Sequence, residues 1–254
     1  MKETYAVLAL IIVMVSVVYA IWGAQAGVVA DFAPGLATEV VGILVTLVFV
    51  QRILDRRQAA DRARASRGGI RRAETPLRDL AHLWSAVIKG SLPQSPTRPP
   101  RTYRALFNSE WAGWIDQADL TGVRYAWNGE TWLESIARVI RLSRHRLSEI
   151  IEVYSVHMDV ALVEALDELR DDPYLARVEA MGEELRALRG EMALEIRPEE
   201  FSLGRSGPER ARMMRTLLRA LDLYNDGGLV EGAIDAVPET FWRAQSIAET
   251  HGEA

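Results

Sequence analysis

The side chains best suited to metal chemistry are His145 and Glu149, which lie one helical turn apart. An imidazole and a carboxylate at this spacing can share a zinc ion, but a zinc site takes at least three protein ligands. The sequence offers no third ligand at a suitable spacing and no HExxH motif. Cysteine is absent, which excludes thiolate sites, disulfides and cysteine nucleophiles. We therefore interpret His145 and Glu149 as a salt pair on a helix surface.

Phosphate binding and serine chemistry find equally little support. Gly204-Arg205-Ser206-Gly207 precedes a predicted helix, whose N-terminal N–H groups could face a phosphate. The segment has neither the preceding strand nor the lysine of a P-loop, and no serine stands in a GxSxG setting. The sequence thus predicts a protein without enzymatic activity, cofactor or small-molecule ligand. An enzyme with an unrecognised helical site is a further alternative.

Glu39 is the one carboxylate inside a long apolar run. Pro34 suits the first turn of a helix, which would place Glu39 near that helix's N-terminus, where the helix dipole favours an anion. Glu39 is then an interfacial carboxylate held by backbone amides and water. Alternatively, it forms a site in an oligomeric pore or contacts a polar partner, because carboxylates within membranes tend to be functional.

Thr38, Gly42 and Thr46 recur every four residues and so line one face of the same predicted helix. Small side chains at this spacing let two helices approach closely in lipid. The face has two interpretations, as packing against the preceding apolar run or as a contact between copies of the chain.

These residues belong to a pair of apolar runs, residues 5–23 and 36–54. The first run has no ionisable side chain except two tyrosines, and its helical length of roughly 28 Å matches the hydrocarbon core of a bilayer. Two such runs joined by a short loop predict a transmembrane helical hairpin over residues 1–54. Ala24-Gln25-Ala26 offers a rival interpretation, in which the first run is a cleaved signal peptide.

Arginines cluster after the second run, whereas the loop between the runs has none. By the positive-inside rule the arginine-rich flank stays in the cytoplasm, with the N-terminus beside it. The arginines nearest the membrane surface, where anionic headgroups would attract them, are Arg52, Arg56, Arg57, Arg62 and Arg64. The net charge of −5 gives no indication of a nucleic-acid partner.

The segment from Gly35 to Thr46 resembles the head of the second span in many uncharacterised bacterial proteins with two transmembrane helices. Their pattern is N-L-x-T-E-x-x-G-I-x-x-T, and Gly35 stands here in the place of the asparagine. The resemblance covers about twelve residues and the general layout. It implies a bacterial inner membrane protein with a helical cytoplasmic domain, and it implies no activity.

The remaining chain is predicted to be helical. Residues 55–90 form a basic juxtamembrane helix that breaks at Gly68-Gly69, and a second helix capped by Thr75 with Pro76 at its first position. Residues 91–102 are proline-rich and predict a linker. Residues 103–254 predict a helical domain in which Thr131 and Glu134 form a capping box and Asp159 caps the next helix. Its last predicted helices span residues 209–224 and 238–250.

Aromatic residues gather between residues 103 and 132, and the spacing of Tyr103, Phe107, Trp111 and Trp114 predicts one helix face in a core, with a pocket or a face on the membrane surface as the alternatives. The chain is therefore expected to be all-α, with an N-terminal transmembrane hairpin followed by a cytoplasmic helical bundle. We expect a membrane-anchored, non-enzymatic interaction or scaffold protein whose partners are the lipid bilayer and a protein or a second copy. The alternative is an oligomeric membrane effector or small channel that the cytoplasmic domain gates.

Overall fold

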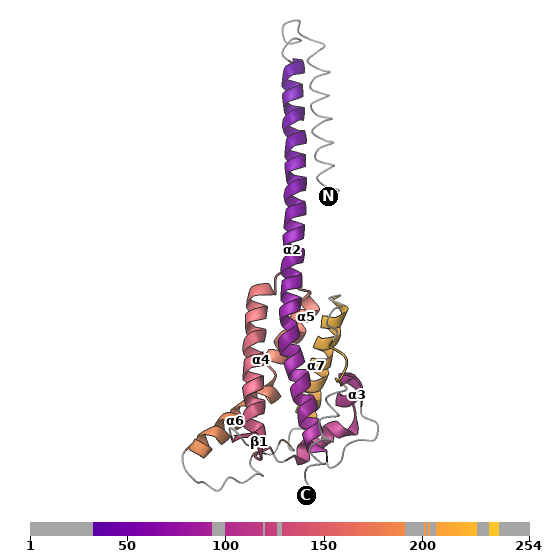
Figure 1. The fold of residues 1–254 in the computed structure, drawn as a ribbon. Coiled ribbons are helices and arrows are strands. Elements are labelled where there is room, and N and C mark those ends of the chain that lie inside the picture. The colour runs from indigo at the N-terminus through magenta and orange to yellow at the C-terminus, as the bar shows by residue number, and fades with distance from the viewer. Residues whose placement is uncertain are drawn as a thin grey trace. The chain divides into compact units, whose positions relative to one another are not determined.

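The structure is a computed structural model of the chain, and it describes residues 33–92, 100–118, 120–125, 129–190, 201, 203, 207–227 and 234–238. The chain divides into two compact units, Met1–Arg62 and Ala63–Ala254. Most of the described residues are helical, which confirms the predicted all-α fold (Figure 1). Besides connections, the rest of this part of the chain contains a two-stranded sheet of five residues.

The first described helix, α2, runs without interruption over Ala33–Ser91. The predicted break at Gly68-Gly69 and the predicted new start at Thr75 are therefore wrong. Pro76 lies inside the helix, where its missing N–H leaves one carbonyl without a helical donor. The two glycines serve close packing instead, because a methyl group on Gly69 would lie 2.8 Å from Cβ of Tyr154.

The predicted first span, residues 5–23, lies outside the described residues. The second, residues 36–54, lies within α2. Within the described part of the chain, no helix meets the joint requirement of length and apolarity for crossing a membrane. Most of the side chains that the structure describes there are apolar and exposed, including Ile43, Val45, Leu47, Phe49, Val50, Ile53 and Leu54.

Helices α4, Trp132–Tyr154, and α5, Val160–Arg170, begin at the residues that the sequence predicts. The Thr131 hydroxyl accepts from the backbone N–H of Glu134, and the backbone N–H of Thr131 donates to the Glu134 carboxylate at 2.7 Å. This reciprocal pair is the predicted capping box. Asp159 caps α5 by accepting from the N–H of Ala161 at 2.9 Å.

Two further helices complete the second unit. Helix α6, Pro173–Gly190, is capped by Asp172, whose carboxylate accepts from the N–H of Tyr174 at 2.9 Å. Helix α7, Gly207–Asp226, matches the predicted helix over residues 209–224 within two residues at each end. Helix α4 packs against both α6 and α5, and α5 packs against α7. Figure 1 shows the end of α6 extending past α4, away from α2, whereas Tyr174 at the start of α6 contacts Trp84 on α2.

The segment after the proline-rich stretch is less regular than predicted. The aromatic residues do not share one helix, because α3 covers only Tyr103–Phe107 and a 3₁₀ helix follows over Glu110–Gln117. Strands β1, Val123–Tyr125, and β2, Glu130–Thr131, form an antiparallel pair that the sequence analysis missed. Residues 93–99 of the predicted linker and residues 239–250 of the last predicted helix lie outside the described residues.

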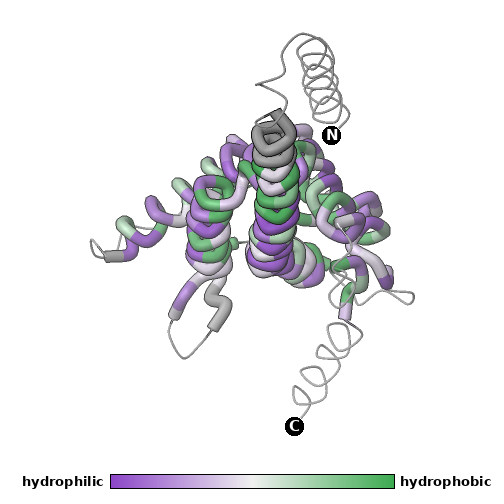
Figure 2. Tube along the Cα trace, turned by 90° about the horizontal axis from the view of Figure 1, so that it is seen from above, coloured by the Kyte–Doolittle hydropathy of each residue, from purple (hydrophilic) through white to green (hydrophobic). Residues whose placement is uncertain are grey.

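The core of the second unit joins all its described helices. Figure 2 shows apolar and hydrophilic stretches alternating along these helices, as helices with one buried face require. Tyr103 and Phe107 are buried, which confirms their assignment to the core. The largest fully buried side chains are Trp84, Tyr103, Tyr174, Tyr224, Leu77, Leu80, Ile88, Leu106, Ile115, Leu133, Ile136 and Ile140.

Helices α2 and α4 run antiparallel, and glycines hold both ends of the pair together. Near the start of the second unit, Gly68 and Gly69 contact the side chain of Tyr154 at the end of α4. At the other end, Gly90 faces the Trp132 ring at the start of α4. Between these two glycine contacts, larger side chains of α2 and α4 face one another.

Candidate functional site: a groove between helices α2 and α4

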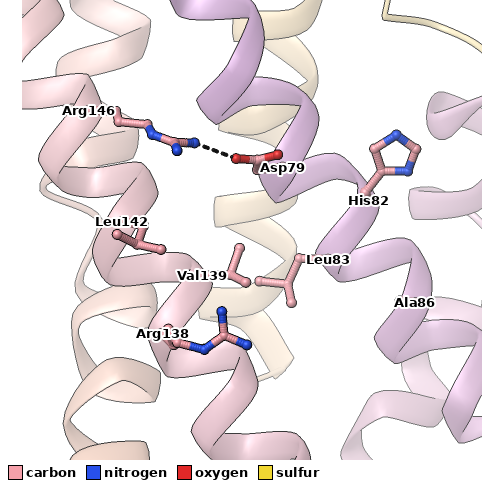
Figure 3. Close-up of a pocket in the computed structure, with 8 residues that line it drawn as sticks. All are labelled: Asp79, His82, Leu83, Ala86, Arg138, Val139, Leu142 and Arg146. Carbon is pink, nitrogen blue, oxygen red and sulfur yellow. Dashed lines mark hydrogen bonds and ion pairs between the residues drawn. The ribbon is translucent and has the colours of Figure 1, made fainter.

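A cavity of about 450 Å³ opens between the middle turns of α2 and α4 (Figure 3). It lies within the second unit, midway between the two glycine contacts. Both helices supply its lining, which consists of Asp79, His82, Leu83, Ala86, Arg138, Val139, Leu142 and Arg146. A cavity of this size is large enough for a few side chains of a binding partner.

The floor of the groove is apolar. Leu83 and Val139 point toward one another across the gap, as Figure 3 shows. Leu142 stands on α4 beside them and is 46% exposed, although its neighbours Ile140 and Ser143 are fully buried. Leu142 therefore extends the apolar floor to the edge of the groove.

The charged side chains of the groove are already paired. Arg146 donates to the Asp79 carboxylate at 2.8 Å, and this ion pair spans the two helices. Arg138 donates from Nε and from one terminal nitrogen to the two oxygens of Glu130, at 3.0 and 3.1 Å. The groove therefore offers an apolar floor bordered by charged side chains that are engaged in ion pairs.

His82 extends from the edge of the groove on α2, away from α4 (Figure 3). The Tyr103 hydroxyl lies 3.3 Å from Nδ1 of His82, and the two rings meet edge to face with centroids 5.9 Å apart. Burial raises the pKa of Tyr103 to about 12, so its hydroxyl stays protonated and can donate to the imidazole. Burial, together with the charge of Arg78, lowers the pKa of His82, while Asp79 opposes the shift.

The lowered pKa of His82 predicts a pH-dependent stability. In the unfolded chain a histidine has a pKa of about 6.5, so the unfolded state binds the proton first as the pH falls. Stability from the neutral imidazole is then fully present above about pH 6.5 and is lost below it. We expect urea midpoints to fall more between pH 7.5 and 5.5 for the native chain than for His82→Gln. An identical fall in both proteins would contradict this assignment.

The residues predicted from the sequence to be capable of metal chemistry do not form a metal site. His145 and Glu149 form the predicted surface pair, with Nε2 3.5 Å from the carboxylate and side chains 72% and 62% exposed. Among the residues that the structure describes, no group of three or more suitable side chains could hold a metal ion.

The predicted membrane residues all lie on α2. The Thr46 hydroxyl donates to the Gly42 carbonyl at 2.8 Å, and a methyl group on Gly42 would have no neighbour within 4 Å. This face is thus open among the described residues. The side chains of Thr38 and Glu39 lie outside the described part. The five predicted surface arginines are exposed, namely Arg52, Arg56, Arg57, Arg62 and Arg64.

The sequence analysis missed the groove, although one signal was present. The buried stripe of α4 includes Ile136, Ile140 and Leu147. Leu142 lies off this stripe, on a side of the helix that also carries Arg138, His145 and Arg146. An apolar residue among charged ones can mark a contact outside the core, but it does not name the helix opposite.

No family model, curated protein or solved structure matches this chain. The function must therefore be argued from the residues themselves. The resemblance of residues 35–46 to bacterial proteins with two spans stays a prediction.

Proposed function

We propose that the chain is a non-enzymatic interaction protein, anchored in a bacterial inner membrane by its N-terminal apolar runs. Its helical second unit would bind a partner protein in the cytoplasm through the groove between α2 and α4. The observation that carries this proposal is the combination of exposed apolar surface on α2 with an apolar groove whose charged groups are already paired.

The exposed apolar residues of the first unit support the anchor. Successive helical residues are turned by about 100°, so Ile43 and Val45 lie on nearly opposite sides of α2, with Phe49 on the side of Val45. Phe49 is 65% exposed and Val45 is 61% exposed. A helix that is apolar on several sides is unfavourable in water and favourable in lipid. The exposed arginines that follow it fit a cytoplasmic flank beside anionic headgroups.

The groove supports a protein partner more than a small molecule or a substrate. Its lining combines an apolar floor with two arginines, and interface centres are typically enriched in apolar side chains and arginine. Arg138 and Arg146 are partly exposed at the rim, with 47% and 43% of their side chains accessible. An amphipathic helix with an apolar stripe is the kind of ligand that such a groove accommodates.

Co-purification of full-length variants in mild detergent tests this proposal. Leu142→Arg would place a charge at the edge of the apolar floor, and Ala180→Arg is a matched change at an exposed position of α6. Cells would be cross-linked, and the bound proteins identified by mass spectrometry. We expect at least one protein to be retained by the native chain and by Ala180→Arg and lost with Leu142→Arg. An identical set for all three, or none for any, would refute partner binding at the groove.

A further inference from the structure

We propose that the chain pairs with a second copy of itself through the end of the second unit at which α4 meets α5. None of the residues involved lines the groove, so this inference goes beyond the proposed function. Three observations support it, namely exposed valines at this end, opposite charges on its two sides, and the lack of ion-pair partners for two of those charges in the described part of the chain.

Exposed apolar side chains gather where α4 ends and α5 begins. Val153 lies in the last turn of α4, Val156 in the connection that follows, and Val160 at the start of α5. Their exposed fractions are 58%, 88% and 69%, whereas the core of the same unit buries most of its large apolar side chains. Single exposed apolar residues need no explanation, but three between residues 153 and 160 form a candidate contact surface.

Arginines border the valines on the α2 side. Gly69 of α2 contacts Tyr154 of α4, and this contact shows which residues of the two antiparallel helices lie at the same level. Arg71 lies two residues after Gly69, so its side chain is turned by about 200° from that contact, away from α4. Arg72 lies between the two directions, with Cζ 5.3 Å from the centre of the Tyr154 ring. Both arginines are exposed.

Carboxylates border the valines on the α4 side. Glu152 lies two residues before Tyr154, so it is turned by about 200° from the same contact, away from α2. Arg71 and Glu152 therefore lie at one level of the helix pair but on opposite sides of it. Neither forms an ion pair with another residue that the structure describes. Glu149, one turn earlier, is a second exposed carboxylate on this side of α4.

This surface is complementary to itself. Its order from the α2 side to the α4 side is Arg71, Arg72, Val153 and Glu152. A two-fold axis along the helices, between Arg72 and Val153, reverses this order in the second copy, so that each Arg71 meets the Glu152 of the other chain. Opposite charges on either side of an apolar centre fix the partner and the register of such a contact. An anionic lipid surface would attract the arginines but repel the carboxylates, which favours a second copy.

The absence of cysteine makes the test direct, because one introduced cysteine is the only thiol in the chain. Full-length Val153→Cys would be cross-linked in intact cells with a membrane-permeant bismaleimide, and the dimer fraction measured on a gel. The experiment would be repeated with Arg71→Glu, with Glu152→Arg and with both reversals. Ala180→Cys, at an exposed position of α6, is the matched control.

With the native charges, we expect Val153→Cys to form a cross-linked dimer and Ala180→Cys to give only the background of random collisions. Either reversal alone should lower the dimer fraction by about tenfold, because it replaces the two attractive pairs of a symmetric dimer with two repulsive ones. The double reversal should restore the dimer. Such a recovery would also show that the charge-reversed chains fold.

Four results would overturn the proposal. Equal cross-linking at residues 153 and 180 would indicate random collision. A loss that the double reversal does not recover would show that the two charges do not meet across a symmetric contact. A loss with Arg71→Glu but not with Glu152→Arg would assign the arginines to anionic lipid headgroups. A cross-linked product whose mass differs from twice that of the chain would assign the surface to another protein.

Discussion

Replacing Trp84 by alanine should lower the free energy of unfolding of the second unit by about 3–5 kcal/mol, the usual cost of removing a large aromatic side chain from a core. Trp84 is fully buried, and its ring centroid lies 5.6 Å from that of Tyr174. Trp84 extends from α2 while Tyr174 belongs to α6, so the contact joins the helix that both units share to the rest of the bundle. Alanine would leave a cavity between them.

Pulse proteolysis in urea, applied to the full-length protein in mild detergent, measures this change. Tyr174→Phe is the matched control. The Tyr174 hydroxyl is buried and has no hydrogen-bond partner among the described residues. Removing an unpaired buried hydroxyl is close to neutral or slightly stabilising, since no bond is lost. A small effect of Trp84→Ala, or a large cost of Tyr174→Phe, would show that this part of the core is packed differently.

Replacing Gly182 by alanine should cost about 1–3 kcal/mol, even though alanine is the better helix former by about 1 kcal/mol. A methyl group on Gly182 would overlap Cβ of Ala137 and would lie 2.9 Å from the carbonyl oxygen of Leu133. The carbonyl belongs to the backbone of α4 and cannot rotate away. The helices α4 and α6 would therefore have to move apart along their whole contact.

Two comparisons isolate the effect of Gly182→Ala on urea unfolding. Gly113→Ala changes a glycine whose added methyl group would have no neighbour within 4 Å, and it should leave the midpoint nearly unchanged. Ala137→Gly removes one of the two clashing partners and should recover part of the loss when combined with Gly182→Ala, a coupling that a double-mutant cycle measures. Additive effects of the two substitutions would contradict the close contact.

Signals within one helix were the part of this fold that the sequence predicted well. Thr131 with Glu134, and Asp159, fixed the starts of α4 and α5 because a cap depends on residues only two or three positions away. The ends of α7 followed from its own apolar spacing in the same way. These features need no knowledge of the rest of the chain.

Features that depend on another helix were predicted wrongly or missed. Gly68-Gly69 has the composition of a turn, but Tyr154 at the end of α4 and Met158 in the connection that follows both approach it. The glycines therefore allow close packing, and α2 continues. The groove is likewise a product of pairing, because Asp79 and Arg146 meet across 67 positions of sequence. The sequence contains His82 and Leu142, but no pattern of neighbouring residues indicates that both line the same cavity.

The central claim is that the N-terminal runs hold this chain in a membrane. Extraction of cell membranes with alkaline carbonate, followed by ultracentrifugation, tests it most directly. We predict that the full-length chain stays in the membrane pellet and that a variant lacking residues 1–54 moves to the supernatant as a folded helical protein. Recovery of the intact chain in the supernatant would contradict the account.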